Sequence, residues 1–540
     1  MRSYDYIIVG AGSAGCVLAN RLTADKDVSV LVLEAGDWDR SFFLKLPLAS
    51  KRMWFEPRFN WNYMSEPEPH LDNRPIAVPR GKVVGGSSSI NGMVYSRGHP
   101  ADYDQWRQMG LQGWGYADVL PYFKRAETDS RGETTYHGGS GPLQVTPYKV
   151  NRKIYNAVTK AAENAGFNGT DDVHGATPEG FGIPDYSIGD GKRSSTARAF
   201  LRPVLSRPNL TVETEALASN IVFENGRAVG LAYRRRGQMQ EVRAEREVIL
   251  SGGAINSPQL LMLSGIGPAD ELREHGIEAR ADLPAVGKNL QDHLAVGIFF
   301  ACSPEISFER ELRLDRLALS MIQWGLTGKG IAAGLPLASM GFLRTRPGLE
   351  RPDIQYLLAP VAPDAEVWFP GLRKPKGPHM TCRIIDLHPE SRGKVTLRSA
   401  NPDDPPVIFN NFLSSAADLI TLRSGIKTAR KIMATEPLTN YVGNEVDPSA
   451  ACQTDDELDK FIRAQSSTIF HPIGTCRMGV DEGSVVDPEL KVRGVDGLRV
   501  IDASVMPTVP GGNTNAPTIM IAEKASDILR GRSPLPAADI

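Results

Sequence analysis

The N-terminal part of the chain reads Tyr4-Asp5-Tyr6-Ile7-Ile8-Val9-Gly10-Ala11-Gly12-Ser13-Ala14-Gly15. The run Tyr4–Val9 is mainly β-branched and aromatic, which is typical of a strand buried on both faces. Residues 16–22 carry apolar side chains at helical spacing, and Val28–Leu33 is a second apolar strand that leads into Glu34. Strand, glycine-rich turn, helix, strand and acid follow one another as in a dinucleotide-binding βαβ unit, so the sequence predicts an α/β fold with a Rossmann-like domain.

The three glycines of this motif have different physical tasks. Gly10 allows the tight turn, Gly12 lets the backbone approach a pyrophosphate, and Gly15 lets the helix pack close to the strand. Ser13 and Ala14 begin the helix, whose N-terminal N–H groups and dipole stabilise a phosphate charge. We predict that all five residues belong to a cofactor site.

Glu34 lies 19 residues beyond Gly15. A carboxylate at the end of the second strand accepts hydrogen bonds from adenosine ribose hydroxyls and disfavours a 2′-phosphate. We predict this role for Glu34, with Ala35 beside it. On these residues alone the dinucleotide can be FAD or NAD.

Composition excludes several classes of protein. The chain has 540 residues, 61 Lys+Arg against 63 Asp+Glu, a formal charge of −2 and 41% hydrophobic residues. This near-neutral balance argues against a nucleic-acid partner, which requires a basic surface. The 52 glycines and 39 prolines stay below the share of about 25–30% that marks low-complexity chains. A large globular protein is predicted.

The numbers and spacing of cysteine and histidine residues indicate whether the protein forms disulfides or binds a metal ion. Five scattered cysteines without C-x-x-C, and nine histidines without H-E-x-x-H, predict neither a disulfide framework nor a metal site. No run approaches the ~18 apolar residues of a membrane span, and no apolar signal segment precedes the first motif. We predict a cytoplasmic protein in a reducing compartment; peripheral contact with the inner face of the membrane and the oligomeric state stay open.

Three further glycine-rich stretches, Gly81–Gly98, Ser251–Gly267 and His471–Pro517, each follow or contain a strand-like apolar run. If all of them serve one cofactor, its domain is discontinuous. We predict a cofactor domain from residues 1–156, 195–297 and 465–540, and a substrate domain from 157–194 and 298–464. The substrate segments lack a βαβ rhythm and hold helical stretches at Leu419–Met433 and Asp455–Gln465, which favours an antiparallel sheet flanked by helices, α+β in overall class.

Four segments within these stretches also carry a resemblance. They are Gly81–Tyr95, including Gly85-Gly86-Ser87-Ser88-Ser89-Ile90-Asn91-Gly92; Gly253–Gly267; His471–Gly479; and Asp502–Pro517. Together with the N-terminal motif they resemble, in the same order, the signatures of the glucose–methanol–choline (GMC) oxidoreductases. The resemblance spans residues 4 to about 530 and looks closest to bacterial FAD-dependent alcohol dehydrogenases and choline dehydrogenase-like members. It implies FAD as the cofactor and an alcohol as the substrate.

Further cofactor contacts follow from the resemblance rather than from spacing. They are Trp61, Val84, Gly85, Asn91, Gly92, Met93, Val94, Ala218, Asp502, Ala503, Asn513 and Thr514. The Gly85-Gly86 turn also suits close backbone approach to a flavin, although an ordinary surface loop is the alternative, and Asp502 could instead cap a helix. Some family members attach the flavin through a histidine before the residue matching Asn91; Ile90 stands there, so we predict non-covalent FAD.

His471 is the predicted catalytic base, because a group that takes the hydroxyl proton needs a pKa near the working pH. The resemblance to the family's catalytic histidine selects it among nine. Asn513 matches the family's second active-site position, where an amide can donate a hydrogen bond to the developing alkoxide. Asn515 is the alternative for that role. His293, in a loop that matches the family, is interpreted as structural.

The predicted reaction is oxidation of a primary alcohol to the aldehyde, with electrons passed to a quinone-type acceptor. An oxygen-using oxidase is the alternative, and a flavoprotein without catalysis or a lyase on the same fold are weaker ones. The segment Met321–Phe342 is expected to form an apolar pocket wall that includes Ile322, Trp324, Leu326, Leu335, Leu337 and Met340. That wall favours aliphatic or aryl-alkyl alcohols over choline or sugars.

Overall fold

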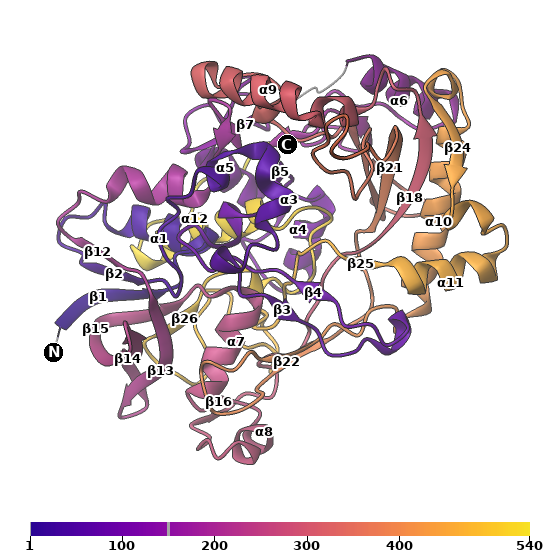
Figure 1. The fold of residues 1–540 in the computed structure, drawn as a ribbon. Coiled ribbons are helices and arrows are strands. Elements are labelled where there is room, and N and C mark those ends of the chain that lie inside the picture. The colour runs from indigo at the N-terminus through magenta and orange to yellow at the C-terminus, as the bar shows by residue number, and fades with distance from the viewer. Residues whose placement is uncertain (1, 148–151) are drawn as a thin grey trace.

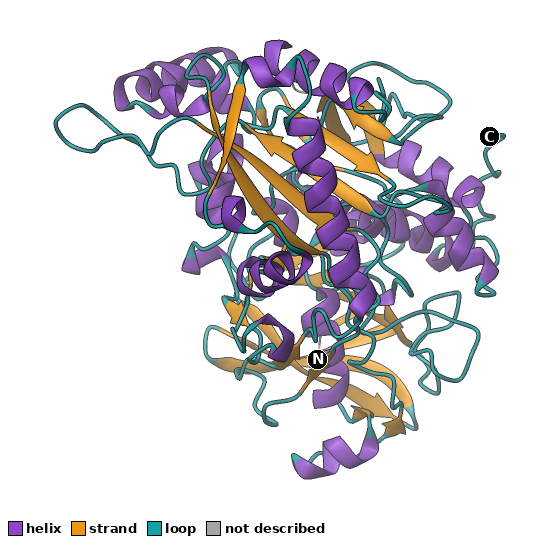
Figure 2. Ribbon diagram, turned by 90° about the vertical axis from the view of Figure 1, so that its right-hand side faces the viewer, coloured by secondary structure: helices purple, strands orange, loops and turns teal. Residues whose placement is uncertain are grey.

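Two large sheets form the framework of the computed structural model, which describes residues 2–147 and 152–540. Residues 1 and 148–151, in the first predicted cofactor-domain segment, lie outside the described residues. The two sheets occupy different parts of the molecule and carry helices on their faces (Figures 1 and 2). The mixed α/β and α+β class predicted from the sequence is confirmed.

The first sheet is built around the N-terminal motif. Its strands in spatial order are β12 (Leu210–Glu213), β2 (Val30–Leu33), β1 (Arg2–Val9), β15 (Gln238–Leu250), β14 (Arg227–Arg235) and β13 (Ala216–Glu224), with β26 (Leu498–Val500) on β15. Along the path β12, β2, β1, β15 and β26 every pairing is parallel. The pairings of β13 with β14 and of β14 with β15 are antiparallel. Ile7, Ile8 and all of β2 are buried, as expected for strands covered on both faces.

Helices from three parts of the chain accompany this sheet. They are α1 (Ser13–Leu22), α4 (Pro100–Gln108), α5 (Tyr116–Ala126), α7 (Gly253–Leu263), α8 (Ala269–Glu274) and α12 (Asn515–Leu529). Among them, α1 packs on β1 and β2, and α7 packs on β13. α12 packs between α1 and α5 and is buried along most of its length. Its buried Glu523 is neutralised by Arg21 and Arg125, each at 2.7 Å, because an unpaired carboxylate there would be costly.

The second sheet is antiparallel, as predicted for the substrate segments. Its strands in spatial order are β24 (Val442–Val446), β18 (Leu294–Cys302), β21 (His379–Asp386), β20 (Ile354–Ala359), β19 (Ser339–Leu343) and β8 (Gly180–Gly182), with β25 (Ser467–Thr468) on β18. Alternate residues of β18, β20 and β21 share one apolar core with α6 (Arg152–Asn164), α10 (Ala416–Met433) and α11 (Asp455–Gln465). The opposite face of this sheet is free to line a cavity.

Shorter elements connect the two sheets. The remaining helices are α2 (Phe42–Lys45), α3 (Ser50–Met53) and α9 (Leu314–Thr327). The remaining strands are β3 (Tyr63–Met64) with β4 (Ala77–Val78), β5 (Val94–Tyr95) with β9 (Asp185–Tyr186), β7 (Leu143–Pro147) and β6 (Glu127–Asp129), β10 (Ile188–Gly189) with β11 (Lys192–Arg193), β16 (Ile266–Gly267) with β17 (Ala281–Asp282), and β22 (Lys394–Thr396) with β23 (Val407–Phe409).

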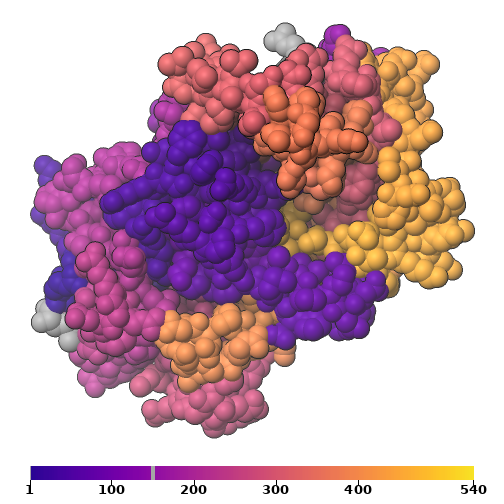
Figure 3. Space-filling view, viewed as in Figure 1, coloured from indigo at the N-terminus to yellow at the C-terminus, as the bar shows by residue number. Residues whose placement is uncertain are grey.

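Segments that are distant in sequence interleave in space. In Figure 3 the indigo N-terminal part fills the middle of the face, and segments from the middle and end of the chain surround it. The predicted limits at residues 156/157, 297/298 and 464/465 fall inside α6, β18 and α11. The division into two domains therefore stays a prediction. A domain limit is not expected inside a helix or strand, so these three limits belong at the ends of α6, β18 and α11. Within residues 2–147 and 152–540, no helix combines the length and apolar character needed to cross a bilayer.

Candidate active site

A cavity of about 590 Å³ runs from the N-terminal motif to the antiparallel sheet. Most of the predicted cofactor residues line it: Gly10, Gly12, Ser13, Ala14, Glu34, Ala35, Trp61, Asn91, Gly92, Met93, Val94, Ala218, Asp502, Ala503, Asn513 and Thr514. His471 lines it as well. The structure thus brings together four glycine-rich stretches that lie hundreds of residues apart in the chain.

Gly15, Val84 and Gly85 are not part of this lining. A Cβ on Gly15 would lie 1.9 Å from the Gly10 carbonyl oxygen, so this glycine allows helix-to-strand packing. Val84 is fully buried in the core of the first sheet. Gly85 has φ +92° and donates its N–H to Ala11 O at 2.7 Å, which fixes the turn that presents the next residues.

Two glycine-rich turns approach each other closely at the helix N-terminus. A Cβ on Gly86 would lie 2.7 Å from Gly12 Cα, so the second turn has no room for a side chain at this point. Glu34 accepts hydrogen bonds from the N–H groups of Ala11 at 2.9 Å and Gly36 at 2.8 Å. Burial raises the pKa of Glu34 to about 7, although these two hydrogen bonds act to lower it. Its carboxylate therefore holds both sides of the turn.

Asp502 has the capping geometry that was the alternative to a cofactor contact. It accepts from Ser504 N at 2.8 Å, Gly253 N at 2.8 Å and Ser257 Oγ at 2.6 Å, and so ties α7 to the turn after β26. Trp61, a predicted cofactor contact, stacks on Tyr63 with ring centroids 5.7 Å apart, and Lys82 Nζ lies 4.6 Å from the Trp61 ring.

His471 and Asn513 meet at the other end of the cavity. The Asn513 amide nitrogen lies 3.0 Å from His471 Nε2, and the Asn513 Oδ1 atom is buried without a hydrogen-bond partner among the described residues. Asn515, the alternative, instead accepts from Ser13 Oγ at 2.7 Å, on the side of the N-terminal motif. Of the two candidate asparagines, Asn513 therefore contacts His471, whereas Asn515 contacts the N-terminal motif.

His293, interpreted as structural from the sequence, contacts His471 directly. The two Nδ1 atoms lie 2.9 Å apart, and His293 Nε2 lies 3.1 Å from Leu387 O. A carbonyl can only accept, so His293 carries its proton on Nε2 and its Nδ1 accepts from His471 Nδ1–H. His471 Nε2 is consequently the unprotonated nitrogen, and it accepts from the Asn513 amide.

The backbone before His471 is held in a constrained conformation. Phe470 has φ +73°, in the left-handed region that bulky residues rarely adopt. Its N–H donates to Thr468 Oγ1 at 2.7 Å, Arg80 donates to its carbonyl, and His471 N–H donates to Asp292 at 2.7 Å. Arg80, Asp292 and His293 thus surround His471, and sequence reasoning assigned none of them a role in the site. The one signal in the sequence was that Asp292 and His293 lie in a loop that resembles the corresponding loop of the family.

Comparison with known proteins places this geometry in a family. The family model described as GMC oxidoreductase matches residues 4–295 with its N-terminal part and residues 389–522 with its C-terminal part. The chain belongs to the GMC oxidoreductases. It is therefore an enzyme acting on CH–OH donors, with FAD as cofactor, as the resemblance in sequence implied.

Relatives and solved structures of GMC enzymes match nearly the whole chain. Choline dehydrogenase of Mus musculus mitochondria is 45% identical, covering 98% of this chain and 90% of the relative. Oxygen-dependent choline dehydrogenase of Burkholderia cenocepacia is also 45% identical, covering 100% and 95%. Pyridoxine 4-oxidase of Mesorbium loti superposes with a TM-score of 0.87 at 29% identity, covering 98% and 100%, and a formate oxidase with 0.89 at 27%, covering 98% and 98%.

The residues present fit FAD. The cavity is lined by glycine-rich backbone at one end, where α1 begins, and by the His471–Asn513 pair at the other. The partnerless Asn513 Oδ1 marks a buried acceptor that a bound group can satisfy. A GMC cofactor and its substrate would together occupy this space.

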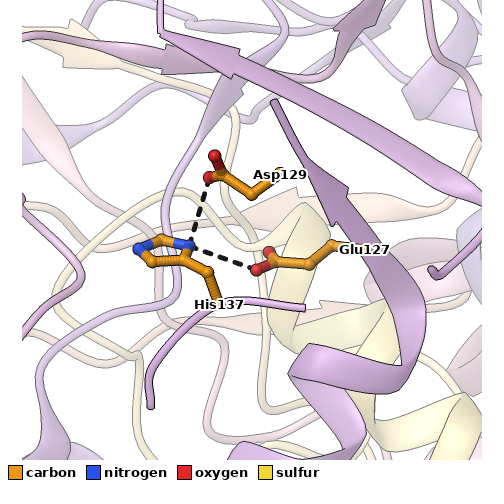
Figure 4. Close-up of side chains that lie close together, drawn as sticks. All are labelled: Glu127, Asp129 and His137. Carbon is orange, nitrogen blue, oxygen red and sulfur yellow. Dashed lines mark hydrogen bonds and ion pairs between the residues drawn. The ribbon is translucent and has the colours of Figure 1, made fainter. Parts of the chain in front are cut away.

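One buried cluster of the described residues has metal-ligand spacing but a different role. Figure 4 shows His137 Nδ1 between Glu127 and Asp129, at 3.2 Å from each carboxylate. Arg97 pairs with Glu127, and Arg131 lies 2.7 Å from Asp129. Burial opposes the charge on His137, but hydrogen bonds to its carboxylate partners outweigh it and raise its pKa to about 10. The positive charges of His137, Arg97 and Arg131 therefore compensate the two carboxylates, as a metal ion would otherwise do.

The predicted pocket wall is only partly correct. Leu335 and Leu337 line the cavity. Ile322 and Leu326 instead lie on the outer face of α9, 60% and 82% exposed. Trp324 faces inward and donates to Gly191 O at 2.6 Å, and Met340 is buried behind the sheet face. The error arose because helical spacing does not tell which face of α9 meets solvent.

The reduction of FAD by alcohol is expected to show no titration near the ordinary histidine pKa of 6.5. Burial, with the nearby His293 and Arg80, lowers the pKa of His471 well below that value. A base must be unprotonated, so a lowered pKa extends its working range to acid, and the rate should stay flat from about pH 8 to 6. Anaerobic stopped-flow across this range measures it, with dithionite reduction as the control for the flavin itself. A fall in rate with a midpoint near pH 6.5 would contradict the assignment.

Proposed function

We propose that this chain oxidises a primary alcohol to the aldehyde, with His471 as the base. The observation that carries the proposal is the contact on the cavity wall between His471 Nε2 and the Asn513 amide nitrogen, which lie 3.0 Å apart. The hydrogen bonds of His293 assign Nε2 as the unprotonated nitrogen of His471. His471 Nε2 takes the hydroxyl proton, and the Asn513 amide orients the substrate oxygen. Trp54 and Phe470, whose ring centroids lie 5.7 Å apart, also line the cavity. When bound, FAD supplies the acceptor for the hydride of the alcohol carbon.

The cavity-lining residues assigned above are proposed to hold FAD without a covalent bond. Ile90 lines the cavity beside Asn91, and its hydrocarbon side chain has no atom that can form such a bond. We predict that precipitation of the protein with acid releases all of its flavin to the supernatant, because only non-covalent contacts are lost. Absorbance of supernatant and pellet measures this. Yellow colour remaining in a washed pellet would refute it.

Aliphatic or aryl-alkyl primary alcohols are proposed as the substrate class. The wall opposite the cofactor end includes Leu335, Leu337, Leu357 and Ala359, all on the cavity face. Choline is a second candidate, which the 45% identical choline dehydrogenases support. A panel of alkyl, benzylic and sugar alcohols with choline, assayed with a redox dye, decides between them by kcat/KM.

A quinone-type compound is proposed as the electron acceptor. The outer face of α9, at the periphery of the molecule in Figure 1, exposes Leu319, Ile322 and Leu326 at 68%, 60% and 82%. Such an apolar face near the cavity suits contact with a membrane that contains the acceptor. Oxygen is the alternative, and the oxygen-dependent relative and the two oxidases support it. Stopped-flow reoxidation in air separates them, since reoxidation slower than turnover excludes an oxidase. A cytoplasmic location stays part of the proposal.

A further inference from the structure

Arg383 points from the second sheet into the cavity. Along β21, Met380, Cys382 and Ile384 are buried in the core with α10, whereas Thr381 and Arg383 line the cavity on the opposite face. Its neighbours across the sheet are Gly297 on β18 and Leu357 on β20. Neither neighbour can form an ion pair with it.

The Arg383 guanidinium has no hydrogen-bond or ion-pair partner among the described residues. Other arginines of the interior have hydrogen-bond partners: Arg97 pairs with Glu127, Arg80 donates to Phe470 O, and Arg193 donates to Asn91 O at 2.7 Å, although Arg193 Nη2 has no partner among the described residues. Burial alone lowers the pKa of Arg383, with no neighbouring acid to oppose it. Arginine nevertheless stays charged in proteins, so this site holds an uncompensated cation.

The charged side chains that line the cavity near Arg383 favour binding of an anion. Among the described residues of the cavity lining, the only acids are Glu34 and Asp502, and both are bound to the cofactor-end turns. Arg80 and Lys51 add positive charge to the same cavity. Arg383 is half-buried on a cavity wall that is largely apolar, so its guanidinium loses part of its hydration there without gaining a partner. A carboxylate is the group whose two oxygens match a guanidinium.

The position of Arg383 along its strand sets how far the anion lies from the reacting carbon. Leu387, whose carbonyl oxygen accepts from His293, lies just beyond the end of β21. It lies four residue steps along the chain from Arg383, a distance between Cα atoms of about 13 Å in an extended strand. A ligand spanning from His471 to Arg383 therefore has its anionic group several bonds from its hydroxyl group.

We propose that Arg383 binds a carboxylate of the substrate, so that this enzyme oxidises a hydroxy acid whose primary alcohol lies several bonds from its carboxylate. The proposal rests on the proposed alcohol oxidation and names its substrate class. The carboxylate is not altered in the reaction. It serves as an anchor that places the alcohol carbon at the His471–Asn513 end. A cation such as choline would be repelled at this position.

Matched substrate pairs test the proposal on the wild-type enzyme. Hydroxyhexanoate with a terminal hydroxyl is compared with hexanol, and para-(hydroxymethyl)benzoate with para-methylbenzyl alcohol. The expected kcat/KM is about 30-fold higher for each carboxylate, the value of one charge-assisted hydrogen-bonded pair. Arg383→Met should bring this ratio close to one, and Arg383→Lys should retain part of it. Arg243→Met, at an exposed arginine paired with Glu224 at 2.7 Å, is the control and should keep the full ratio.

Binding of hexanoate, which has no hydroxyl, provides a readout that does not need turnover. Titration of the FAD-loaded protein, followed by flavin absorbance, should give about 30-fold tighter binding than hexanamide, and Arg383→Met should abolish the difference. If no alcohol is oxidised, the proposed function fails, while this titration still tests the subsite. Equal kcat/KM within both pairs, a preference for choline, or equal binding of hexanoate and hexanamide would each overturn the proposal. If Arg383→Met loses FAD, the wild-type comparisons and Arg383→Lys decide.

Discussion

Alanine at His471 should leave a yellow, FAD-loaded protein whose flavin is reduced by alcohol about a thousand-fold more slowly. The side chain is buried, and its Nε2 is the unprotonated nitrogen beside Asn513. Without it, no group at this end of the cavity takes the hydroxyl proton. Anaerobic stopped-flow reduction with a saturating alcohol isolates this step from the later transfer to an acceptor.

Two further histidine variants sharpen this test. His293→Leu keeps the base but removes the acceptor for His471 Nδ1–H, and an effect of about 10- to 100-fold is expected. His275→Ala, at the end of α8 and outside the cavity lining, should reduce at the wild-type rate. An unchanged rate for His471→Ala at full FAD content would remove His471 from the role of base.

Alanine at Gly15 should prevent assembly of the FAD site. The added Cβ would lie 1.9 Å from Gly10 O and 3.3 Å from Ile8 Cγ2, which forces α1 away from β1. Overpacking against backbone costs about 3 kcal/mol or more, and it displaces the helix N-terminus where the pyrophosphate is proposed to bind. The flavin-to-protein ratio after purification, and the gain in Tm on adding FAD, measure the loss.

Gly325→Ala is the matched control. Gly325 lies inside α9, and a Cβ there would meet no atom within 4 Å. This variant should keep its FAD and be more stable by about 0.5–1 kcal/mol, because alanine favours the helix over glycine. A Gly15→Ala protein with wild-type FAD content would contradict the packing role assigned to this glycine.

Patterns that depend on neighbouring residues predicted the structure well. The helix over Asp455–Gln465 has the predicted bounds, and Val28–Leu33 yields the strand β2 from Val30 to Leu33. The pocket wall at Ile322 and Leu326 was wrong, because α9 has apolar residues on both its inner and its outer face. Three of the four predicted domain limits fell inside α6, β18 and α11, because no local pattern marks where a chain passes from one domain to another.

Local spacing was sufficient for the dinucleotide motif, because it is encoded within about 30 consecutive residues. The family, FAD and the candidate base were predicted from a resemblance carried by five segments spread along the chain. The tertiary structure alone brought His293 to His471, since a contact across 178 residues follows from how β18 and β25 pair. It alone also left Arg383 facing the cavity without a partner. Whether a charge is compensated depends on every element that packs around it, and no single segment of sequence contains that information.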